Sequence, residues 1–195
     1  MLSLKKVIHV WLVPNELFVR HNKKYSLTTS EVIFRRLLSQ YIGQIAKKIP
    51  ILHNKYGKPF IDHQIKFNIS HRGDWHVFSF VRDAEIGVDV ECVQPIDDLF
   101  AFAKFVLPAD HANLIMKGRS DVGLWRFYKY WTQCEAYSKL VGRGLFDFFD
   151  LHRIISFNVY SKTIIFSLNY ILTVVCTKKM SVKVLLFEDN NQILL

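Results

Sequence analysis

Apolar and polar positions alternate along this chain with two different periods, and the pattern predicts a mixed α+β fold. Residues 5–13 (KKVIHVWLV) form an apolar run rich in β-branched side chains, which predicts a strand. Residues 30–45 place apolar side chains three or four positions apart, which predicts an amphipathic helix. Gly57 and Pro59 then mark a loop that separates this helix from the strands that follow.

Three further strands are expected in the middle of the chain. Residues 66–69 and 75–81 predict two of them, joined by a turn over residues 70–74 (SHRGD). Residues 85–91 predict the third. The strands predicted in the last part of the chain are residues 154–160, 163–168, 170–176 and 182–187.

Helices are expected between the two groups of strands. Residues 98–117 and 120–141 predict helical segments, and Gly142 ends the second of them. The order strand, helix, strands therefore occurs twice. We expect two similar α/β lobes, an N-terminal lobe over residues 1–85 and a C-terminal lobe over residues 86–195.

The composition is that of a basic globular protein. Half of the 195 residues are hydrophobic, which argues against disorder because disordered segments combine low hydrophobicity with high net charge. The 26 Lys and Arg against 17 Asp and Glu give a net charge of +9, which favours polyanionic partners. The positive residues are scattered in pairs such as Lys23-Lys24, so charge indicates the sign of the partner and not its identity. A nucleic-acid-binding protein would need basic and aromatic residues on one face, and is the weaker interpretation.

No membrane span or secretory leader is predicted. The longest uncharged stretch, residues 163–177, contains polar side chains and falls short of the ~20 apolar residues of a membrane helix. Residues 1–16 place lysines inside an apolar run without a small-residue cleavage site, which argues against a signal peptide. The cysteines at 92, 134 and 176 lie far apart, so reduced thiols in a cytoplasmic protein are expected rather than a zinc site.

Two acidic residues in an otherwise apolar strand are the first candidates for chemistry. In the segment IGVDVE, period-two alternation places Asp89 and Glu91 on one face and the valines on the other. Two carboxylates on one face repel each other unless a cation lies between them, and hard oxygen ligands select Mg²⁺. A solvated strand face is the alternative, because this spacing alone is a weak signal.

The long helix and the turn before it supply further candidates. Trp131, Glu135 and Lys139 are successive i, i+4 neighbours and share one stripe of the helix. A surface ion pair is the simpler interpretation of Glu135 and Lys139 taken alone. Ser70 and His71 follow a predicted strand and offer a hydroxyl and an imidazole to a phosphate, although an ordinary turn with a surface histidine would look the same.

Four short motifs follow one another between residues 56 and 145. They are GKP at 57–59, FNISH at 67–71, GVDVE at 87–91 and WTQCEAYSK at 131–139, which GRGL follows. Their order resembles the larger monomeric 4′-phosphopantetheinyl transferases, the surfactin-synthetase-activating type of the holo-acyl-carrier-protein synthase superfamily. The signatures of that family are approximately GKP, FNxSH, GxDxE and WxxKExxxK. Four motifs in order are far more specific than any one of them.

The resemblance implies an enzyme, and with it a fold and partners. The enzyme would transfer the 4′-phosphopantetheine of coenzyme A to a serine of an acidic apo carrier protein (acyl, polyketide or peptidyl) and release 3′,5′-ADP. It would be a monomer of two α/β lobes related by a pseudo-two-fold axis, with the coenzyme A cleft between them. The positive net charge suits both an acidic carrier and a phosphorylated donor.

The resemblance also implies roles for individual residues. Asp89, Glu91 and Glu135 would hold Mg²⁺ together with the pyrophosphate of coenzyme A. Glu135, or Glu91 through a water, would accept the serine proton, and Lys139 would contact the transferred phosphate or the departing 3′,5′-ADP. The residues implied in binding coenzyme A are Lys58 at its nucleotide end and Ser70, His71 and Lys139 at its phosphates.

Two positions depart from the family pattern. Cys134 stands where the family has Lys before the helix glutamate, and Arg72 stands where Ser commonly follows the Ser-His pair. We expect Cys134 to be a packed residue rather than a nucleophile, because no His lies nearby in the sequence to activate it. The alternative to an enzyme is a non-catalytic relative that binds a carrier protein or coenzyme A. The retained carboxylates argue against it, because a binding scaffold has no need of adjacent negative charges.

Overall fold

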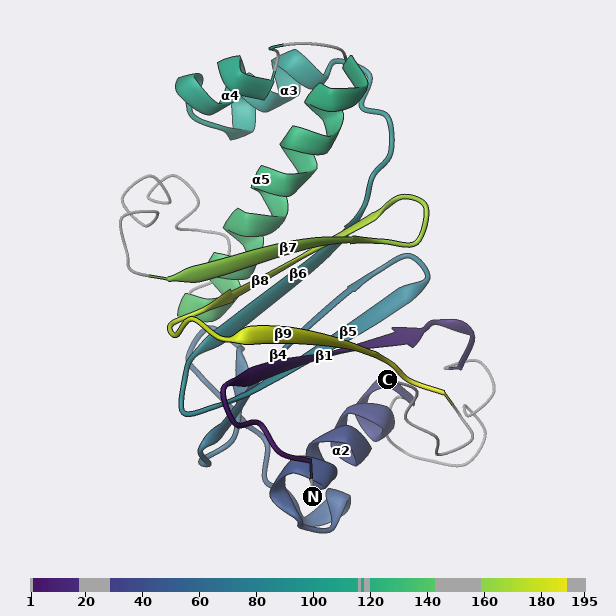
Figure 1. The fold of residues 1–195 in the computed structure, drawn as a ribbon, viewed down its shortest axis with the longest axis vertical. Coiled ribbons are helices and arrows are strands. Elements are labelled where there is room, and N and C mark those ends of the chain that lie inside the picture. The colour runs from purple at the N-terminus through teal and green to yellow at the C-terminus, as the bar shows by residue number, and fades with distance from the viewer. Residues whose placement is uncertain (1, 18–28, 116, 118–119, 143–158, 189–195) are drawn as a thin grey trace.

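The structure, a computed structural model, describes residues 2–17, 29–115, 117, 120–142 and 159–188. Its strands lie in the middle of the molecule, with helices on two sides (Figure 1). The elements in chain order are β1 (Val7–Pro14), α2 (Thr29–Ile42), η1 (Ala46–Lys48), β2 (Leu52–His53), β3 (Pro59–Phe60), β4 (Ile65–Arg72), β5 (Trp75–Arg82), β6 (Ile86–Cys92), α3 (Leu99–Val106), α4 (Ala109–Ile115), α5 (Ser120–Val141), β7 (Tyr160–Phe166), β8 (Tyr170–Cys176) and β9 (Ser181–Leu186).

The strands form two main sheets, and β2 and β3 form a separate short ribbon. The four-stranded sheet has the order β4-β5-β1-β9, and the three-stranded sheet has the order β6-β8-β7. Within the two main sheets β1 and β9 run parallel, while the other neighbouring strands are antiparallel. The strand β9 therefore joins the sheet of the N-terminal strands, although it comes from the last part of the chain.

One arrangement of elements occurs twice. The strand β1 is followed by α2 and the hairpin β4–β5, and β5 pairs with β1. In the same way β6 is followed by α5 and the hairpin β7–β8, and β8 pairs with β6. The predicted α+β fold class is confirmed.

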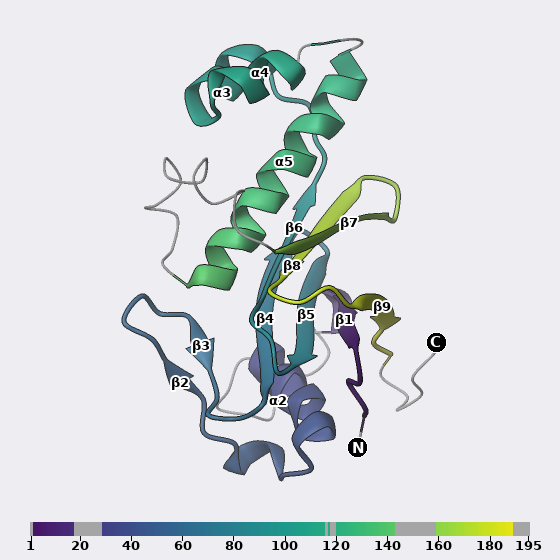
Figure 2. The same cartoon turned by 60° about the vertical axis from the view of Figure 1, so that its left-hand side comes forward.

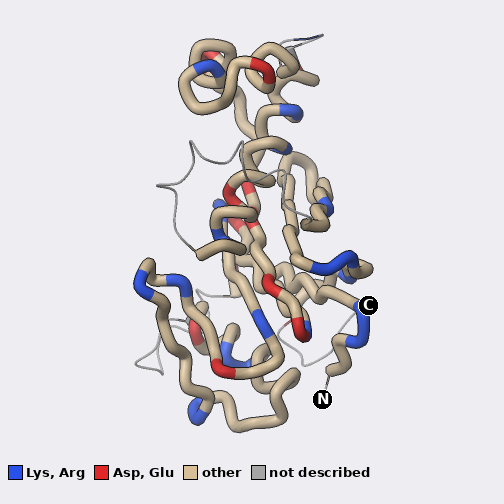
Figure 3. The backbone as a smooth tube through the Cα atoms, turned by 90° about the vertical axis from the view of Figure 1, so that its left-hand side faces the viewer, with Lys and Arg blue, Asp and Glu red and all other residues tan. Residues whose placement is uncertain are grey.

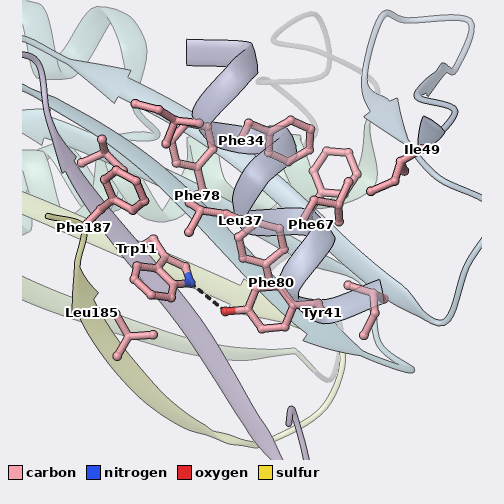
Figure 4. Packing of buried hydrophobic residues seen from close by; sticks show 14 of the residues in the cluster. Trp11, Phe34, Leu37, Tyr41, Ile49, Phe67, Phe78, Phe80, Leu185 and Phe187 are labelled. Atoms are coloured by element: carbon pink, nitrogen blue, oxygen red, sulfur yellow. Dashed lines mark hydrogen bonds between the residues drawn. The ribbon is translucent and has the colours of Figure 1, made fainter. Parts of the chain in front are cut away.

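The helix α2 covers the outer face of the four-stranded sheet with an aromatic core (Figure 4). The ring of Phe34 on α2 lies 5.8 Å from that of Phe78, and the ring of Tyr41 lies 4.6 Å from that of Phe80. The Trp11 indole donates a hydrogen bond of 2.6 Å to the Tyr41 hydroxyl, which is fully buried. The indole N–H of Trp11 and the hydroxyl of Tyr41 therefore have a hydrogen-bond partner inside the core.

The inner face of this sheet packs against the three-stranded sheet, through Val10 on one side and Val88 and Leu172 on the other. The helix α5 covers the opposite face of the three-stranded sheet, where Ala136 and Leu140 pack on Val175. Figure 2 also shows α2 and α5 on opposite sides of the strands. This layering leaves one face of β6 in the core between the sheets and turns the other face toward α5.

Two of the predicted boundaries are wrong for reasons of turn geometry. The helix predicted to reach residue 45 ends at Ile42, because Gly43 has a φ of +73° and stops it. The turn predicted over residues 70–74 is shorter: residues 73–74 alone connect the two strands of a hairpin, since Arg72 still pairs with Trp75. Gly73, with a φ of +54°, supplies the left-handed backbone that such a tight hairpin needs.

The remaining predicted helices and strands form where the structure describes the chain, with limits that differ by a few residues. The strand predicted over residues 163–168 is part of β7, which ends at Phe166 because residues 167–169 form a turn, and the short strands β2 and β3 were not predicted. The helical stretch predicted over residues 98–117 forms as α3 and α4, and α5 ends before Gly142, which has a φ of +72°. Of the strand predicted over residues 154–160, positions 154–158 lie outside the described residues. No helix among the described residues is long and apolar enough to cross a membrane.

Candidate active site

Asn68 fixes the strand β4 against β6 at the centre of the site. Its side-chain oxygen accepts a hydrogen bond of 2.9 Å from the backbone N–H of Val88, and its backbone oxygen accepts one from the Ser79 hydroxyl. The Asn68 side chain is buried, so these bonds form away from water and are costly to break. No role was predicted for Asn68, although an Asn inside an apolar strand is a signal of such a buried contact.

Ser70, Asp89 and Lys139 meet beside this contact. The Ser70 hydroxyl donates to Asp89 Oδ1 at 3.0 Å, and Lys139 Nζ donates to the same oxygen at 2.6 Å. Lys139 Nζ also lies 2.8 Å from Ser70 Oγ. Three predicted site residues from β4, β6 and α5 thus form one hydrogen-bonded group, and the predicted placing of Asp89 on the face opposite Val88 is confirmed.

The second oxygen of Asp89 has a different environment. Asp89 Oδ2 is buried and accepts no hydrogen bond from the described residues. A buried carboxylate oxygen without a donor is costly, and such atoms mark places where a ligand or an ion completes the site.

Glu91 lies on the same face of β6 and pairs with Arg72. Arg72 Nε lies 3.0 Å from Glu91 Oε2. Burial of Glu91, and next the charge of Asp89, raise the pKa of the Glu91 carboxyl above its usual value, while Arg72 and Lys139 oppose that rise. This ion pair was not predicted, because the turn expected over residues 70–74 separated Arg72 from the strand.

Glu135 faces the same group of charges from α5. Burial of this carboxyl, and next the negative charge of Asp89, raise the pKa of Glu135 to about 7, with Lys139 acting in the opposite direction. A carboxyl with such a pKa exchanges protons near neutral pH, which is the property of a general base or acid.

A pocket of about 330 Å³ opens between the loop at 56–59, β4 and the C-terminal half of α5. It brings Lys58, Glu135 and Lys139 together, and Ser70 reaches it through its contact with Lys139. The residues that line the pocket are Tyr56, Gly57, Lys58, Pro59, Asn68, Ile69, Glu135, Ser138, Lys139 and Gly142.

His71 lies apart from this pocket. It is exposed, and its ring stacks on that of His76 at 5.3 Å across the hairpin. Side chains of a strand alternate between faces, so His71 points away from the face that carries Ser70. Its predicted contact with a phosphate stays a prediction.

The loop that carries Lys58 is attached to the end of α5. Lys58 Nζ donates to the backbone oxygen of Leu140 at 2.9 Å, and the Asn54 side chain donates to that of Gly142 at 2.9 Å. The Asn54 side-chain oxygen also accepts from the backbone N–H of Tyr56 and Lys58. These contacts satisfy carbonyls that a helix leaves free at its C-terminus. No role was predicted for Asn54, although an Asn at the start of a glycine turn is a signal of such contacts.

Gly87 explains how closely α5 approaches β6. A Cβ atom at this position would lie 1.8 Å from the backbone oxygen of Ala136. Only a residue without a side chain allows this approach, and a glycine inside a strand is a known signal of it. The contact places Glu135 and Lys139 of α5 over Asp89.

Cys134 is buried, as expected for a packed residue. Burial raises the pKa of the Cys134 thiol to about 12, so the thiol is protonated near neutral pH. A protonated, buried thiol is a poor nucleophile, and the packed interpretation is confirmed.

The residues fit a divalent cation chemically, but their present contacts are with protein cations. No group of three His, Cys, Asp or Glu side chains in the described part of the chain is arranged to hold a metal. Asp89 and Glu91 instead pair with Lys139 and Arg72. Three hard carboxylate donors and a buried Asp89 oxygen without a hydrogen bond nevertheless suit Mg²⁺.

Carboxylates, an ammonium group and a hydroxyl thus lie beside one pocket. Residues 85–179 match the family model of the 4′-phosphopantetheinyl transferase superfamily. The resemblance seen in the motifs of the chain is confirmed by this match.

Named relatives agree with this family. The chain is 32% identical over 129 residues to the 4′-phosphopantetheinyl transferase gsp of Aneurinibacillus migulanus, covering 66% of this chain and 53% of that protein. It is 30% identical over 133 residues to psf-1 of Bacillus pumilus, covering 67% and 49%, and 29% identical over 134 residues to HetI of Nostoc sp., covering 66% and 55%. Both of these also carry the name 4′-phosphopantetheinyl transferase. The chain spans about half the length of these curated relatives.

Proposed function

We propose that this protein transfers 4′-phosphopantetheine from coenzyme A to a serine hydroxyl of an apo carrier protein and releases 3′,5′-ADP. The observation that carries the proposal is the meeting of Ser70, Asp89 and Lys139 beside a pocket that Glu135 lines. Residues from three separate motifs come together there, in a chain whose relatives are named 4′-phosphopantetheinyl transferases.

The chemistry requires a base and a partner for phosphate charge. The carrier serine oxygen forms a bond to the β-phosphorus of coenzyme A, and the bond from that phosphorus to the oxygen of 3′,5′-ADP breaks. Glu135 is our candidate for the group that accepts the serine proton, because it lines the pocket and burial raises its pKa to about 7. The Lys139 ammonium stabilises negative charge on the transferred phosphate and the leaving group.

The coenzyme A phosphates would bind to Ser70 and Lys139, and Lys58 would lie toward the nucleotide end. Burial lowers the pKa of Lys58, which lines the same pocket and is fixed to the end of α5. The contact of His71 with a phosphate is the least supported part of this set, because His71 lies on the other face of β4.

Asp89, Glu91 and Glu135 would hold Mg²⁺. When bound, the ion would offset the charge of the pyrophosphate. The buried Asp89 oxygen that accepts no hydrogen bond from the described residues supports this assignment.

We also propose that the two lobes, residues 1–85 and 86–195, are related by a pseudo-two-fold axis. The repeated order of strand, helix and hairpin supports this relation, while β9 comes from residues 86–195 and pairs with β1 of the first lobe. An acidic carrier protein is the proposed partner, since the net charge of the chain is +9. Lys and Arg are scattered along the described chain (Figure 3), which does not favour a nucleic-acid partner. A monomeric state and a cytoplasmic location stay predictions.

Intact-mass measurement tests the proposed activity. Apo carrier proteins of the acyl, polyketide and peptidyl classes are incubated with the protein, coenzyme A and Mg²⁺. At least one carrier should gain the mass of one phosphopantetheine, and EDTA should prevent that gain. If no carrier gains mass while coenzyme A still binds, the chain is a non-catalytic binding protein and the proposal is wrong.

A further inference from the structure

Two protein cations occupy the carboxylates that are proposed to bind the metal. Lys139 Nζ lies 2.6 Å from Asp89 Oδ1, and Arg72 Nε lies 3.0 Å from Glu91 Oε2. The Asp89 side chain is 6% exposed and that of Glu91 18%, whereas that of Arg72 is 56% exposed. The carboxylates are therefore fixed in the site, while the guanidinium of Arg72 can leave it without losing contact with water.

We propose that Arg72 is a positioning residue that pairs with Glu91 until the donor binds. A phosphate of the donor then replaces Glu91 as the partner of Arg72. Phosphate then pairs with Arg72 and Lys139, and the freed carboxylates become available to a divalent cation. This inference rests on the proposed function, because it takes coenzyme A as the source of the phosphate. The protein should therefore bind a divalent cation weakly without coenzyme A and more tightly in its presence.

The position of Arg72 on the strand supports the exchange. Ser70 and Arg72 lie two residues apart on one face of β4, and this face contacts Asp89 and Glu91 of β6. Two residues along a strand span about 7 Å, so an anion at Ser70 lies within reach of the long Arg72 side chain. A guanidinium group can bind phosphate through two parallel hydrogen bonds, and Arg72 contacts Glu91 through its Nε atom.

The electrostatics of the site give the size of the effect. A positive charge a few ångströms from a divalent cation repels it, and the partly solvated surroundings of Glu91 reduce that repulsion without removing it. We expect removal of Arg72 to raise metal affinity in the absence of coenzyme A by about tenfold. Because the variant has no Arg72 for coenzyme A to displace from Glu91, coenzyme A should then strengthen metal binding less than it does in the wild type.

The simpler alternative is that Arg72 only fastens β4 to β6 as a surface ion pair. In that case its removal would change stability by less than about 1 kcal/mol and leave metal affinity alone. Arg82 provides the matched control. It lies at the end of the adjacent strand β5, its guanidinium bonds to Gln64 at 2.7 Å, and its loss removes the same charge away from the carboxylates.

The experiment measures Mn²⁺ binding by isothermal titration calorimetry, with and without coenzyme A, for the wild type, Arg72→Ala, Arg72→Gln and Arg82→Ala. Without coenzyme A, both Arg72 variants should bind Mn²⁺ about tenfold more tightly than the wild type. Arg82→Ala should match the wild type. Melting curves show that each variant is folded, and Arg72→Gln keeps a polar side chain in case the alanine variant is unstable.

Two results separate this inference from the proposed function. If the Arg72 variants bind Mn²⁺ as the wild type does, or more weakly, Arg72 is only a surface ion pair and the inference is overturned. Carrier modification by the wild type in the same preparations would then still support the transferase. If the wild type modifies no carrier but the Arg72 variants bind Mn²⁺ more tightly, the counter-ion role is supported and the transferase proposal fails.

Discussion

Replacement of Gly87 by alanine should separate α5 from β6 and damage the active site. The new Cβ atom would lie 1.8 Å from the Ala136 backbone oxygen and 2.6 Å from the Leu140 backbone nitrogen. Ordinary contact begins at 3.4 Å, so the two backbones must move apart by about 1.6 Å. Neither contact is with a flexible side chain, so the helix or the strand itself has to shift.

This shift sets the expected magnitudes. A displacement of about 1.6 Å would lengthen the contact of 2.6 Å between Lys139 and Asp89 beyond hydrogen-bonding distance. Misplacement of catalytic groups by about 1 Å costs about 10²-fold in rate. Overpacking of this kind also lowers the free energy of unfolding by about 1–3 kcal/mol.

The assay compares Gly87→Ala with the wild type by carrier modification under initial-rate conditions and by urea unfolding. Gly57→Ala is the control for stability alone, because Gly57 lines the pocket while a Cβ atom there meets no atom within 4 Å. The φ of +86° at Gly57 makes that variant strained, so it should lose about 1 kcal/mol of stability while α5 stays in place. A Gly87→Ala protein with the stability and rate of the wild type would refute the close-approach argument.

Three other predictions concern separate parts of the molecule. Glu135→Gln should lower turnover by about 10²-fold or more with little change in melting temperature, and near-normal turnover at saturating Mg²⁺ and coenzyme A would remove Glu135 from the chemistry. Tyr41→Phe removes a buried hydroxyl that bonds to Trp11 and His9, so urea unfolding should show a loss of about 1–3 kcal/mol, with unchanged turnover per folded molecule. Burial, and next the charge of His71, lower the pKa of His76 to about 4, so between pH 6.5 and about 4 the unfolded chain binds a proton there that the folded chain does not. When the pH is lowered from 7 to 5, the free energy of unfolding should therefore fall by about 1–2 kcal/mol more in the wild type than in His76→Gln. Identical pH profiles of the two proteins would contradict this prediction.

Local spacing predicted much of this molecule, because backbone geometry decides which side chains share a face. Alternation along β6 placed Asp89 and Glu91 together, and the i, i+4 spacing on α5 placed Glu135 and Lys139 on one stripe. These relations depend on bonds between neighbouring residues, so they can be read without the fold. The order of the motifs was sufficient to indicate the family.

Turns and strand ends were predicted less well, because their limits depend on single backbone angles and on pairing partners. The hairpin at Gly73 keeps Arg72 in β4, and this pairing decides which face carries each residue from Ser70 onward. A shift by one position would exchange Ser70 for His71 at the site. Both Ser70 and His71 were predicted to contact a phosphate. In the fold Ser70 bonds to Asp89, whereas His71 stacks on His76.

Only the tertiary structure decided which faces meet. The ion pair of Arg72 with Glu91, the attachment of Lys58 to Leu140 and the pairing of β9 with β1 join residues far apart in the chain. Such contacts follow from packing two sheets and two helices into layers, which no local period encodes. The sequence supplies the chemical groups of this site, and long-range packing determines which cation faces each carboxylate.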